Sequence, residues 1–592
     1  MAQASTTTVQ QALALAVRHH EQGRWAAAEE VYQAILQQHP QRFEALHLLG
    51  VLKHQTGHSQ EGLALIEQAL ALRPDDAPAL SNAGLVLRAL QRPQDALQAY
   101  DKAVERDPGF AQAWANRGNV LRDLGQAGQA LQAYARAIAC QAGYAQAWHG
   151  KGLAHFDLGQ FEQARQCHLQ ALALQGASAS VEVDLGNALR ELDQLRDALA
   201  CYDRALQLQP AYAQALSNRG VVLKQLGDFA QAQQSYERAI ALDPKFVDAH
   251  VNLGTLLKDT QRLQEAQAAY ARALQLDPAS SSAHLNLAIA LLLEGQLPQG
   301  LQEYEWRWKT AQMADGQRGF AQPAWEPGDR LQGKTLLLHA EQGLGDTLQF
   351  CRYAAVAAAQ GARVVLEVQP ALVNLLQGLS GVAELVARGS ALPDFDLQCP
   401  LLSAPRAAQT TLDTIPAERA YLRPKPDYVQ KWQAAVGAPH ARRIGVAWSG
   451  RPEHKNDMHR SMAFAQFARA LPQGPAYWCL HKDIRASDRA ALAQRADVRV
   501  VADALATFDD TAALICAMDL VIAVDTSVAH LAAALGKPVW LLLPYCPDWR
   551  WMLHRTDTPW YPGMRLFRQT AYAHWDATLE AVARCLGAAP AP

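Results

Sequence analysis

A period of 34 residues runs through the first half of the chain. Proline occurs at positions 40, 74, 108, 210, 244 and 278, and every gap between them is 34 or a multiple of it. Glycine follows the same period from Gly50 to Gly254, and alanine does so from Ala28 to Ala266. The period predicts eight complete units, about 7–40 through 245–278, and a partial ninth that ends near Thr310.

One unit indicates how such a repeat folds. In residues 215–244, apolar side chains recur at helical spacing in two stretches with Gly227 between them, which predicts a hairpin of two helices. The small residues Gly220 and Ala232 allow the helices to approach closely. Pro244 ends the second helix because proline cannot continue it. A single hairpin cannot bury its apolar face, so we expect neighbouring hairpins to stack.

The unit resembles the tetratricopeptide repeat, as Trp114, Gly118, Ala130 and Tyr134 illustrate in one copy. The resemblance covers residues 7–312. It implies an all-α superhelix with a concave groove that binds a protein or peptide.

An asparagine column accompanies the repeat, two positions before the repeated glycine. Gly150 and Asp184 interrupt it. Because an amide both donates and accepts hydrogen bonds, the column indicates either a consensus feature of the repeat or a ladder that grips a peptide backbone. Such a ladder lines the superhelix of the eukaryotic protein O-GlcNAc transferases, which this chain resembles in architecture. The candidate acceptor groove is lined by Asn82, Asn116, Asn218, Asn252 and Asn286.

The second half has a different pattern. Residues 313–333 are irregular and predict a linker. Short apolar stretches then alternate with helical segments, which predicts βαβ units and parallel sheets. We expect strands at 335–340, 363–368, 442–450, 476–480, 520–525 and 538–544 and near 498–502. The pattern predicts two Rossmann-like lobes, 334–428 and 440–592, with a ligand at the carboxyl ends of the strands.

Three segments of this half resemble the family-9 glycosyltransferases, which include heptosyltransferases. They are LHAEQGLGDTLQF (338–350), GVAWSGRPEHKNDMHRS (445–461) and DTSVAHLAAALGKPVWLLLP (525–544). The resemblance implies a GT-B fold, a nucleotide-sugar donor and transfer with inversion. The order of domains resembles that of bacterial glycosyltransferases linked to tetratricopeptide repeats.

The donor site is predicted where the strand 520–525 runs into a helix. A Ser or Thr at that point caps the first turn, and the free N–H groups and dipole of a helix start favour a diphosphate. We expect the backbone of Thr526, Ser527 and Val528 to contact phosphate. Asp525 either holds sugar or ribose hydroxyls or caps the helix, and His530 either faces the donor or is structural.

Two loops complete the predicted site. In the loop 451–460, Lys455 and Arg460 would neutralise the leaving diphosphate, and the resemblance makes Lys455 the phosphate lysine. Gly343 and Gly345 allow a ligand to approach the backbone. The resemblance makes Asp346 the general base, although a helix cap is the alternative. His339 and Glu341 are reserve candidates for the base.

Composition excludes several functional classes. The formal net charge of −3 gives no basic field for nucleic acid, and no apolar stretch is long enough to span a membrane. The N-terminal residues lack the pattern of a signal peptide, and nine scattered cysteines fit reduced thiols, so we expect a cytoplasmic protein. We expect no metal and no cofactor beyond the donor substrate.

The sequence therefore leads to the hypothesis of an inverting, metal-independent glycosyltransferase with a protein hydroxyl as acceptor. One alternative is a transferase acting on glycan or lipopolysaccharide, with repeats that only localise it. Another is a repeat scaffold without catalysis.

Overall fold

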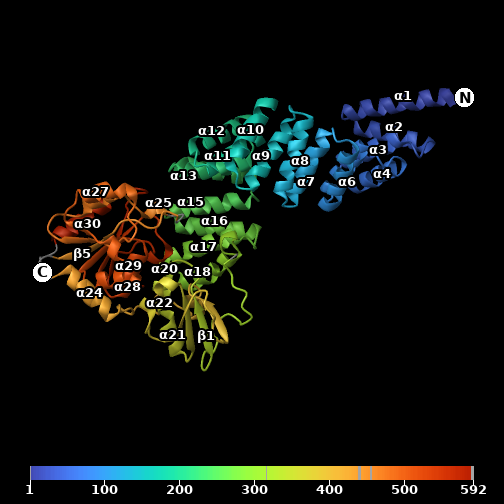
Figure 1. Cartoon of the computed structure of the whole chain (residues 1–592). Helices are drawn as coiled ribbons and strands as arrows, with labels where there is room; N and C mark the ends of the chain where they lie inside the picture. Colours follow the sequence, from blue (N-terminus) through green and yellow to red (C-terminus); the bar gives the residue numbers. More distant parts are fainter. Residues whose placement is uncertain (1, 315, 438–441, 454–456, 589–592) are drawn as a thin grey trace. The chain divides into compact units, whose positions relative to one another are not determined.

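The computed structural model describes residues 2–314, 316–437, 442–453 and 457–588. It divides into two compact units, Met1–Pro244 and Lys245–Pro592. The first unit contains helical repeats, and the second contains the last repeats together with the α/β part (Figure 1). The predicted fold class is confirmed, because a helical repeat region is followed by parallel sheets. No helix within the described residues has the length and apolar content to cross a bilayer.

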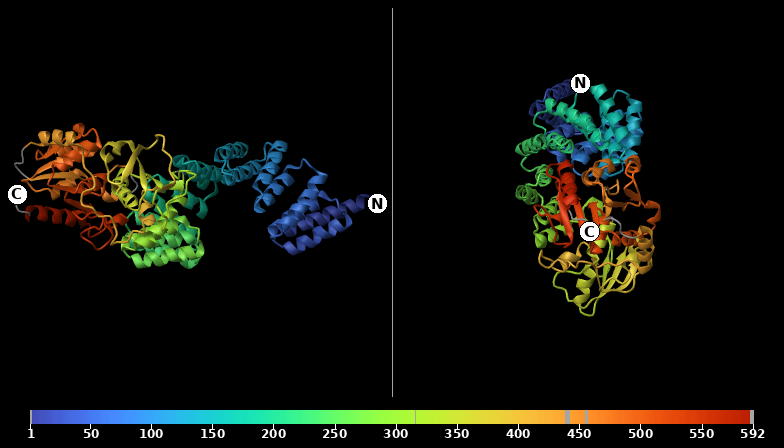
Figure 2. Two further views of the ribbon diagram at one scale, coloured as in Figure 1. Left: turned by 90° about the horizontal axis from the view of Figure 1, so that it is seen from below. Right: turned by 90° about the vertical axis from the view of Figure 1, so that its left-hand side faces the viewer.

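The repeats are helical hairpins that stack in sequence order within each unit (Figures 1 and 2). Each repeat contributes two helices. Their bounds are α1 (Ala2–Glu21), α2 (Trp25–Gln38), α3 (Phe43–Gln55), α4 (Ser59–Leu72), α5 (Ala77–Ala89), α6 (Pro93–Arg106), α7 (Ala111–Asp123), α8 (Ala127–Cys140), α9 (Ala145–Asp157), α10 (Phe161–Gln175), α11 (Ala179–Glu191), α12 (Leu195–Leu208), α13 (Ala213–Gln225), α14 (Phe229–Leu242), α15 (Val247–Asp259), α16 (Leu263–Leu276), α17 (Ser281–Glu294) and α18 (Leu297–Tyr304).

A glycine under a tyrosine ring fixes the approach of the two helices in a hairpin. A Cβ on Gly118 would lie 2.7 Å from the nearest ring atom of Tyr134, and the ring of Tyr134 is fully buried. The Tyr134 hydroxyl donates to Asn119 Oδ1 at 2.7 Å. The same contact recurs between Gly254 and Tyr270, where the distance would be 2.5 Å. The expected close approach at the repeated glycine is therefore confirmed.

The turn between the two helices has a left-handed residue that also repeats every 34 positions. Glycine occupies most of these positions because it adopts positive φ without steric cost. The residues are Gly23, Gly57, Gln91, Gly125, Gly159, Asp193, Gly227, Gln261 and Gly295. The backbone thus keeps the period even where glycine is replaced.

The α/β part contains two parallel sheets, and the predicted strands are found within a few residues of their expected positions. Strands β3, β4 and β10 were not predicted. The strands are β1 (Thr335–His339), β2 (Arg363–Val368), β3 (Val382–Ala387), β4 (Leu397–Pro400), β5 (Arg443–Ala447), β6 (Ala476–Cys479), β7 (Val498–Val500), β8 (Leu520–Val524), β9 (Val539–Leu543) and β10 (Met564–Arg568). The helices used below are α20 (Leu344–Phe350), α24 (Pro426–Val436), α25 (Asp457–Arg460), α28 (Phe508–Cys516) and α29 (Ser527–Ala534).

The strand order places two switch points at the carboxyl ends of the sheets. The first sheet has the order β3-β2-β1-β4, and the second has β10-β9-β8-β5-β6-β7. The order of the second sheet is that of dinucleotide-binding folds, with the reversal between β5 and β8. Ligands of open α/β sheets bind outside the strand ends at such a reversal. The loops that follow β5 and β8 are therefore the first place to look for a site.

One apolar core joins the last repeat to both sheets. It includes Leu292 of α17, Leu338 of β1, Phe350 of α20, Leu541 of β9 and Trp551. The chain segment that links the two sheets packs against the second sheet. Trp432 of α24 donates its indole N–H to Asp510 of α28 at 3.1 Å. The predicted limits of the two lobes, 334–428 and 440–592, stay predictions, and α24 lies with the second sheet.

A buried arginine connects the last repeat to the first sheet. The 3₁₀ segment η1 (Glu305–Lys309) follows α18, and its Arg307 is 1% exposed. Arg307 Nη2 donates to both carboxylate oxygens of Glu341 at 3.1 Å and to Ser403 Oγ at 2.6 Å. Glu341 follows β1 and Ser403 follows β4, so Arg307 fills the switch point of the first sheet. Burial raises the pKa of Glu341 to about 7, and the guanidinium of Arg307 opposes that shift.

We expect Gly118→Ala to destabilise the first unit by about 1–3 kcal/mol, because the new methyl group would overlap the ring of Tyr134. Gly128→Ala is the matched control, since Gly128 lies in α8 and a Cβ at this position would have no neighbouring atom within 4 Å. The control should be neutral or slightly stabilising. Urea unfolding followed by circular dichroism measures both, and equal stability of the two variants would contradict the close-packing account.

We expect Arg307→Met to destabilise the second unit by about 3–5 kcal/mol, because it leaves the buried Glu341 carboxylate without its cation. The double variant Arg307→Met/Glu341→Gln should recover most of the loss, since the uncompensated charge is gone. Denaturant unfolding of the full chain gives both values. A single variant as stable as the parent would show that Arg307 does not join the repeat to the sheet.

Candidate functional site

The turn from β8 into α29 has an open helix start. Thr526 is at the N-cap position with extended backbone, but its hydroxyl donates to Val524 O at 3.3 Å and does not cap the helix. The predicted side-chain cap is therefore wrong. The N–H groups of Ser527 and Val528 lie in the first turn and have no intrahelical acceptor. This turn can accept an anion through its backbone.

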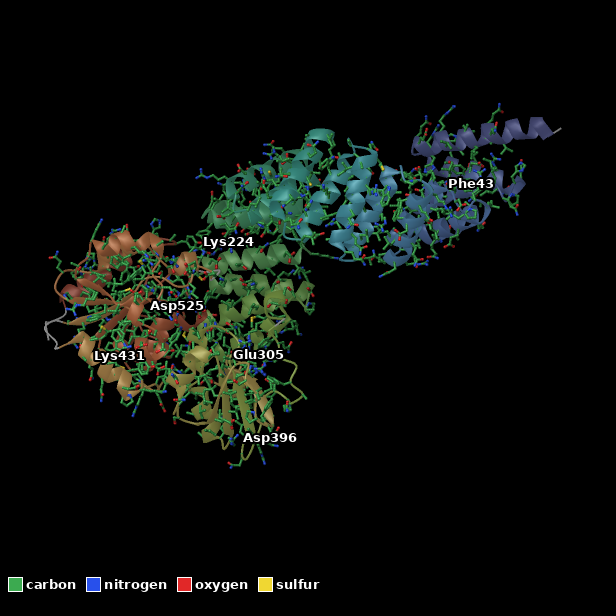
Figure 3. The ribbon with its side chains drawn as sticks, viewed as in Figure 1. Phe43, Lys224, Glu305, Asp396, Lys431 and Asp525 are labelled. Atoms are coloured by element: carbon green, nitrogen blue, oxygen red, sulfur yellow. The ribbon has the colours of Figure 1, made fainter. Side chains whose placement is uncertain are left out.

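Asp525 lies at the end of β8, where Figure 3 labels it. Its Oδ2 accepts the indole N–H of Trp551 at 2.9 Å, and its backbone carbonyl accepts Arg460 Nη1 at 2.8 Å. Burial raises the pKa of Asp525 to about 6, and repulsion from the Asp548 carboxylate adds to the shift. Two neighbours thus hold Asp525 in place, and burial keeps its pKa above the usual range of a carboxyl.

His530 lies beneath this turn as a neutral ring. Its Nδ1 is 3.0 Å from the Tyr561 hydroxyl, and its Nε2 is 3.7 Å from Asp525 Oδ1. The ring stacks on Trp551 with 5.4 Å between centroids. Burial, together with nearby arginines, lowers the pKa of His530 well below its usual value. His530 is 6% exposed and therefore supports Asp525 rather than supplying a cation.

Two arginines, Arg460 after β5 and Arg485 after β6, lie at the same strand ends. Arg460 of α25 reaches the carbonyl of Asp525, as described above. Arg485 donates to the carbonyl of Gly450 at 2.9 Å and pairs with Asp457. Gly450 N–H in turn donates to Ser461 Oγ at 2.8 Å. Arg460 therefore spans the reversal between β5 and β8, and its predicted role at the diphosphate stays a prediction. The sequence analysis missed Arg485.

Lys455, the predicted phosphate lysine, lies outside the described residues. The same holds for residues 454 and 456 of this loop. The role of Lys455 at the phosphate stays a prediction.

The start of α20 lies against the start of α29. A Cβ on Gly345 would be 3.1 Å from His530 Cδ2 and 3.6 Å from Ser527 Cα. Only a residue without a side chain fits there without movement. Gly343 is the N-cap of α20, and its N–H donates to Asp346 Oδ2 at 2.8 Å. Gly345 thus lets the loop after β1 lie against the turn from β8 into α29.

Asp346 is bound on both oxygens. Its Oδ2 caps α20, and its Oδ1 pairs with Arg550, which also binds Asp548 Oδ1 at 2.8 Å. The Asp346 side chain is 21% exposed. The two roles weighed from sequence, helix cap and reactive carboxylate, are therefore compatible. A carboxylate oxygen has two lone pairs and keeps one for a further donor.

Arg550 comes from the segment 544–562, which is dense in Trp, Tyr and Arg. This segment packs into the core, where Trp551 is fully buried, and it also supplies Arg550 and Trp551 to the site. The sequence analysis missed both residues, and the density of aromatic and arginine residues in this segment is the signal that could have found them. The Nε atoms of Arg460, Arg485 and Arg550 are buried without a hydrogen-bond partner among the described residues.

The arrangement thus gathers three guanidinium groups and an open helix start at one switch point. The carboxylates of Asp346, Asp457 and Asp548 pair with these arginines. The carboxylate of Asp525 accepts the indole N–H of Trp551, beside Arg550. Such a site can bind an anion through backbone N–H groups and stabilise negative charge that develops on it.

Most of the asparagine column is engaged within the repeats. Asn82 Nδ2 lies 2.9 Å from His47 Nε2, and Asn286 Nδ2 donates to Ser282 O at 2.9 Å. Asn218 is 8% exposed and binds Asn187 and Gln214. Asn252 also has an interaction partner, and Asn116 is partly exposed. These contacts favour the consensus interpretation of the column, and an acceptor role for it stays a prediction.

Comparison with known families supports the assignments of both halves of the chain. Tetratricopeptide-repeat family models match residues 13–77, 53–111, 81–145, 115–180, 186–227, 213–246 and 251–312. The model of glycosyltransferase family 9 (heptosyltransferase) matches residues 481–543, which run from the end of β6 to the end of β9. The match includes Asp525, the open helix start and His530.

The chain is thus a tetratricopeptide-repeat protein with an α/β region at its C-terminal side. That region carries a glycosyltransferase family 9 segment, which supports its assignment as a glycosyltransferase.

Individual relatives match parts of the chain. Protein FlbA of Caulobacter vibrioides is 26% identical over 328 residues, which are 50% of this chain and 54% of that protein. The chain thus spans about half the length of this curated relative.

Among solved structures, Cut9–Hcn1 of the APC/C has 20% identity and a TM-score of 0.38 over 45% of this chain and 52% of that one. YrrB, described as a TPR protein with an unusual peptide-binding site, has 24% identity and a TM-score of 0.27 over 32% of this chain and 96% of that one. PilF of Pseudomonas aeruginosa has 21% identity and a TM-score of 0.32 over 35% of this chain and 94% of that one. All three scores are below 0.5, and the fold rests on the helices and strands described above.

We expect the affinity for a nucleotide sugar to rise about threefold between about pH 7.5 and pH 5.5. The pKa of Asp525 is raised to about 6, so its carboxylate gains a proton over this range and repels a diphosphate less. Asp525→Asn should bind more tightly at pH 7.5 and show a flatter profile. Calorimetric titration at several pH values measures this, and an unchanged pH dependence in the variant would remove Asp525 from the binding site.

Proposed function

We propose that the chain is an inverting, metal-independent glycosyltransferase of the GT-B type. It would transfer a sugar from a nucleotide-diphosphate donor to a hydroxyl of a protein recruited by the repeats. One observation carries the proposal: three arginines whose Nε atoms are buried and an open helix start meet at the switch point of a sheet that has the strand order of nucleotide-binding folds. The family 9 match over the same turn supports it.

The donor diphosphate would lie at the start of α29, against the backbone of Thr526, Ser527 and Val528. Arg460 and Lys455 would supply positive charge as the bond from the anomeric carbon to the diphosphate breaks. The electron pair of that bond leaves with the diphosphate, so preformed cations there lower the barrier.

Asp346 would take the proton of the acceptor hydroxyl. The hydroxyl oxygen attacks the anomeric carbon from the face opposite the diphosphate, and this single displacement inverts the configuration. Arg550 would orient Asp346, because it pairs with Asp346 Oδ1. Gly343 and Gly345 would leave room for the acceptor chain near Asp346.

A protein acceptor is supported by the way the last repeats meet the strand ends. Gln261, directly after α15, donates its amide to the carbonyl of Tyr545, and Cys546 Sγ lies 3.7 Å from Lys258 O. Tyr545 and Cys546 follow β9, the strand next to β8, and therefore lie beside the turn from β8 into α29. A segment held by these repeats would therefore reach the loops of the site. The heptosyltransferase activity for which family 9 is named favours the second candidate, a glycan acceptor.

The donor is identified first by thermal shift of the full chain with UDP, GDP, ADP, CMP and dTDP in EDTA. A ligand that binds the folded state at a hundredfold excess over its Kd adds about 2.7 kcal/mol of stability. A shift with one nucleotide supports the donor site. No shift, with or without added Mg²⁺ or Mn²⁺, would favour a scaffold without catalysis.

With the labelled donor, we expect Asp346→Asn to bind within about threefold of the parent but to lose transfer by about 10²–10⁴-fold, as removal of a general base does. Asp548→Asn is the matched control, since it removes the other carboxylate partner of Arg550 and should keep transfer within about tenfold. Label is counted in the protein and glycan fractions of a lysate, which separates the two acceptors. Full transfer by Asp346→Asn would exclude it as the base.

A further inference from the structure

Two consecutive repeats of the first unit present a tryptophan beside a cation. Arg117 Cζ lies 5.7 Å from the ring centre of Trp114 on α7, and Lys151 Nζ lies 5.4 Å from that of Trp148 on α9. The two pairs are one repeat apart, at the same positions of the repeat. No other repeat has tryptophan there, since the equivalent residues are Leu46, Leu80, Glu182, Leu216, His250 and His284.

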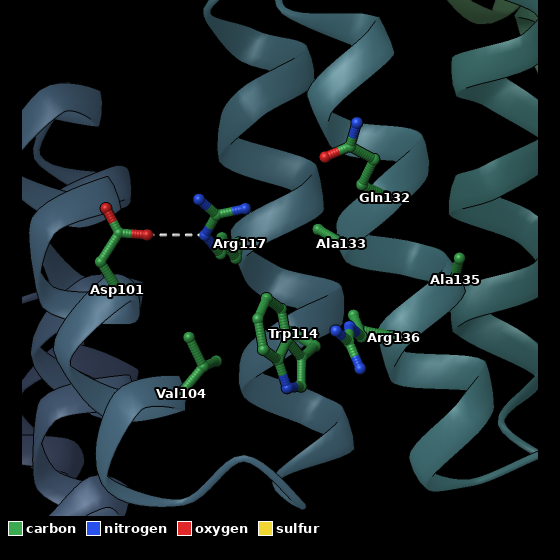
Figure 4. A pocket seen from close by; sticks show the side chains of 8 residues that line it. All are labelled: Asp101, Val104, Trp114, Arg117, Gln132, Ala133, Ala135 and Arg136. Atoms are coloured by element: carbon green, nitrogen blue, oxygen red, sulfur yellow. Dashed lines mark hydrogen bonds and ion pairs between the residues drawn. The ribbon is translucent and has the colours of Figure 1, made fainter.

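A cavity of about 570 Å³ adjoins the first pair (Figure 4). It is formed by α6, α7 and α8, so it includes the second helices of two neighbouring repeats. Small side chains on α8 leave the space open beside the indole ring of Trp114. The lining residues are Asp101, Val104, Trp114, Arg117, Gln132, Ala133, Ala135 and Arg136.

The charged residues that line this cavity have a net positive charge. Arg117 Nε donates to Asp101 Oδ1 at 2.6 Å, which neutralises one arginine (Figure 4). Arg136 is exposed and forms no ion pair or hydrogen bond with the residues that the structure describes. Lys151 in the next repeat adds a further cation. The cavity therefore offers an apolar aromatic wall, small alanines and a cation without a counter-charge.

This surface differs from the groove that the asparagine column lines. Successive residues of a helix are rotated by about 100°. On α7, Asn116 is therefore rotated by about 200° from Trp114 and by about 100° from Arg117. Trp114 and Arg117 themselves lie about one turn apart on one face. The cavity is thus a second surface of the repeats, separate from the predicted acceptor groove.

We propose that this cavity binds an acidic segment of a protein partner. A carboxylate side chain of the segment pairs with Arg136 and with the terminal nitrogens of Arg117, and an adjacent apolar side chain packs on Trp114. A second carboxylate, further along the segment, reaches the Trp148–Lys151 pair. A guanidinium beside an aromatic face is a strong partner for a carboxylate, and it also contacts apolar side chains. This inference is independent of the proposed transferase activity.

The test uses a random peptide library displayed on phage and the full chain as bait. Peptides that bind the double variant Trp114→Ala/Arg136→Glu are removed first, so that the remaining binders depend on the cavity. We expect those binders to be enriched in Asp or Glu next to an apolar residue. An absence of remaining binders, or binders without enriched carboxylates, would overturn the proposal.

The selected peptide is then synthesised with a fluorescent label and measured by anisotropy. We expect Arg136→Glu alone to weaken its binding at least tenfold, and Gln in place of its acidic residues to do the same. Arg272→Glu is the matched control, because Arg272 has the same repeat position in a repeat with His250 in place of tryptophan. Arg136 and Arg272 are both exposed, so neither change disturbs packing. Equal weakening by Arg272→Glu would show a general charge effect and overturn the site.

Discussion

The ion pair between Arg307 and Glu341 is the contact on which the second unit depends. A buried guanidinium needs partners, and the two terminal nitrogens of Arg307 bind groups that follow β1 and β4 and Glu305 of its own segment. The end of the repeat array thus becomes part of the first sheet. Because Arg307 occupies the reversal of that sheet, the space where an open α/β sheet would bind a ligand is filled there. The loops after β5 and β8 are left to form the site.

A second buried arginine joins the two sheets in a similar way. Arg550 pairs with Asp346 at the start of α20 and with Asp548 in its own segment. Gly345 allows α20 to lie against α29, because a Cβ at this position would be only 3.1 Å from His530 Cδ2. The residues that join the sheets are therefore the residues of the candidate site. A substitution in this group changes both stability and binding, so each test above separates the two by measuring binding of the folded protein.

The sequence predicted features that depend on local pattern and missed features that depend on distant contacts. The 34-residue period predicted the helical hairpins, and apolar stretches predicted β1, β2, β5, β6, β8 and β9 to within a few residues. Strand β3 was missed because Glu384 interrupts its apolar stretch, and β4 was missed because it has only four residues and ends in a proline. Arg307 and Arg550 could not be predicted as joints, since their partners are 34 and 204 residues away. The hydroxyl of Thr526 shows the same limit: its residue type predicts a cap, but its rotamer bonds Val524 instead.

The asparagine column and the tryptophan pairs show why a repeat needs contacts as well as a pattern to define a binding surface. Asn218 belongs to the periodic column, yet its amide is hydrogen-bonded to Asn187 of a neighbouring helix and to Gln214 of its own helix. Trp114 and Trp148 break the period, since only these two repeats have tryptophan at that position. A residue that recurs in every unit serves what every unit shares, which is packing. A surface that selects one partner needs residues that differ from unit to unit, and an unpaired cation such as Arg136 beside Trp114 is of that kind.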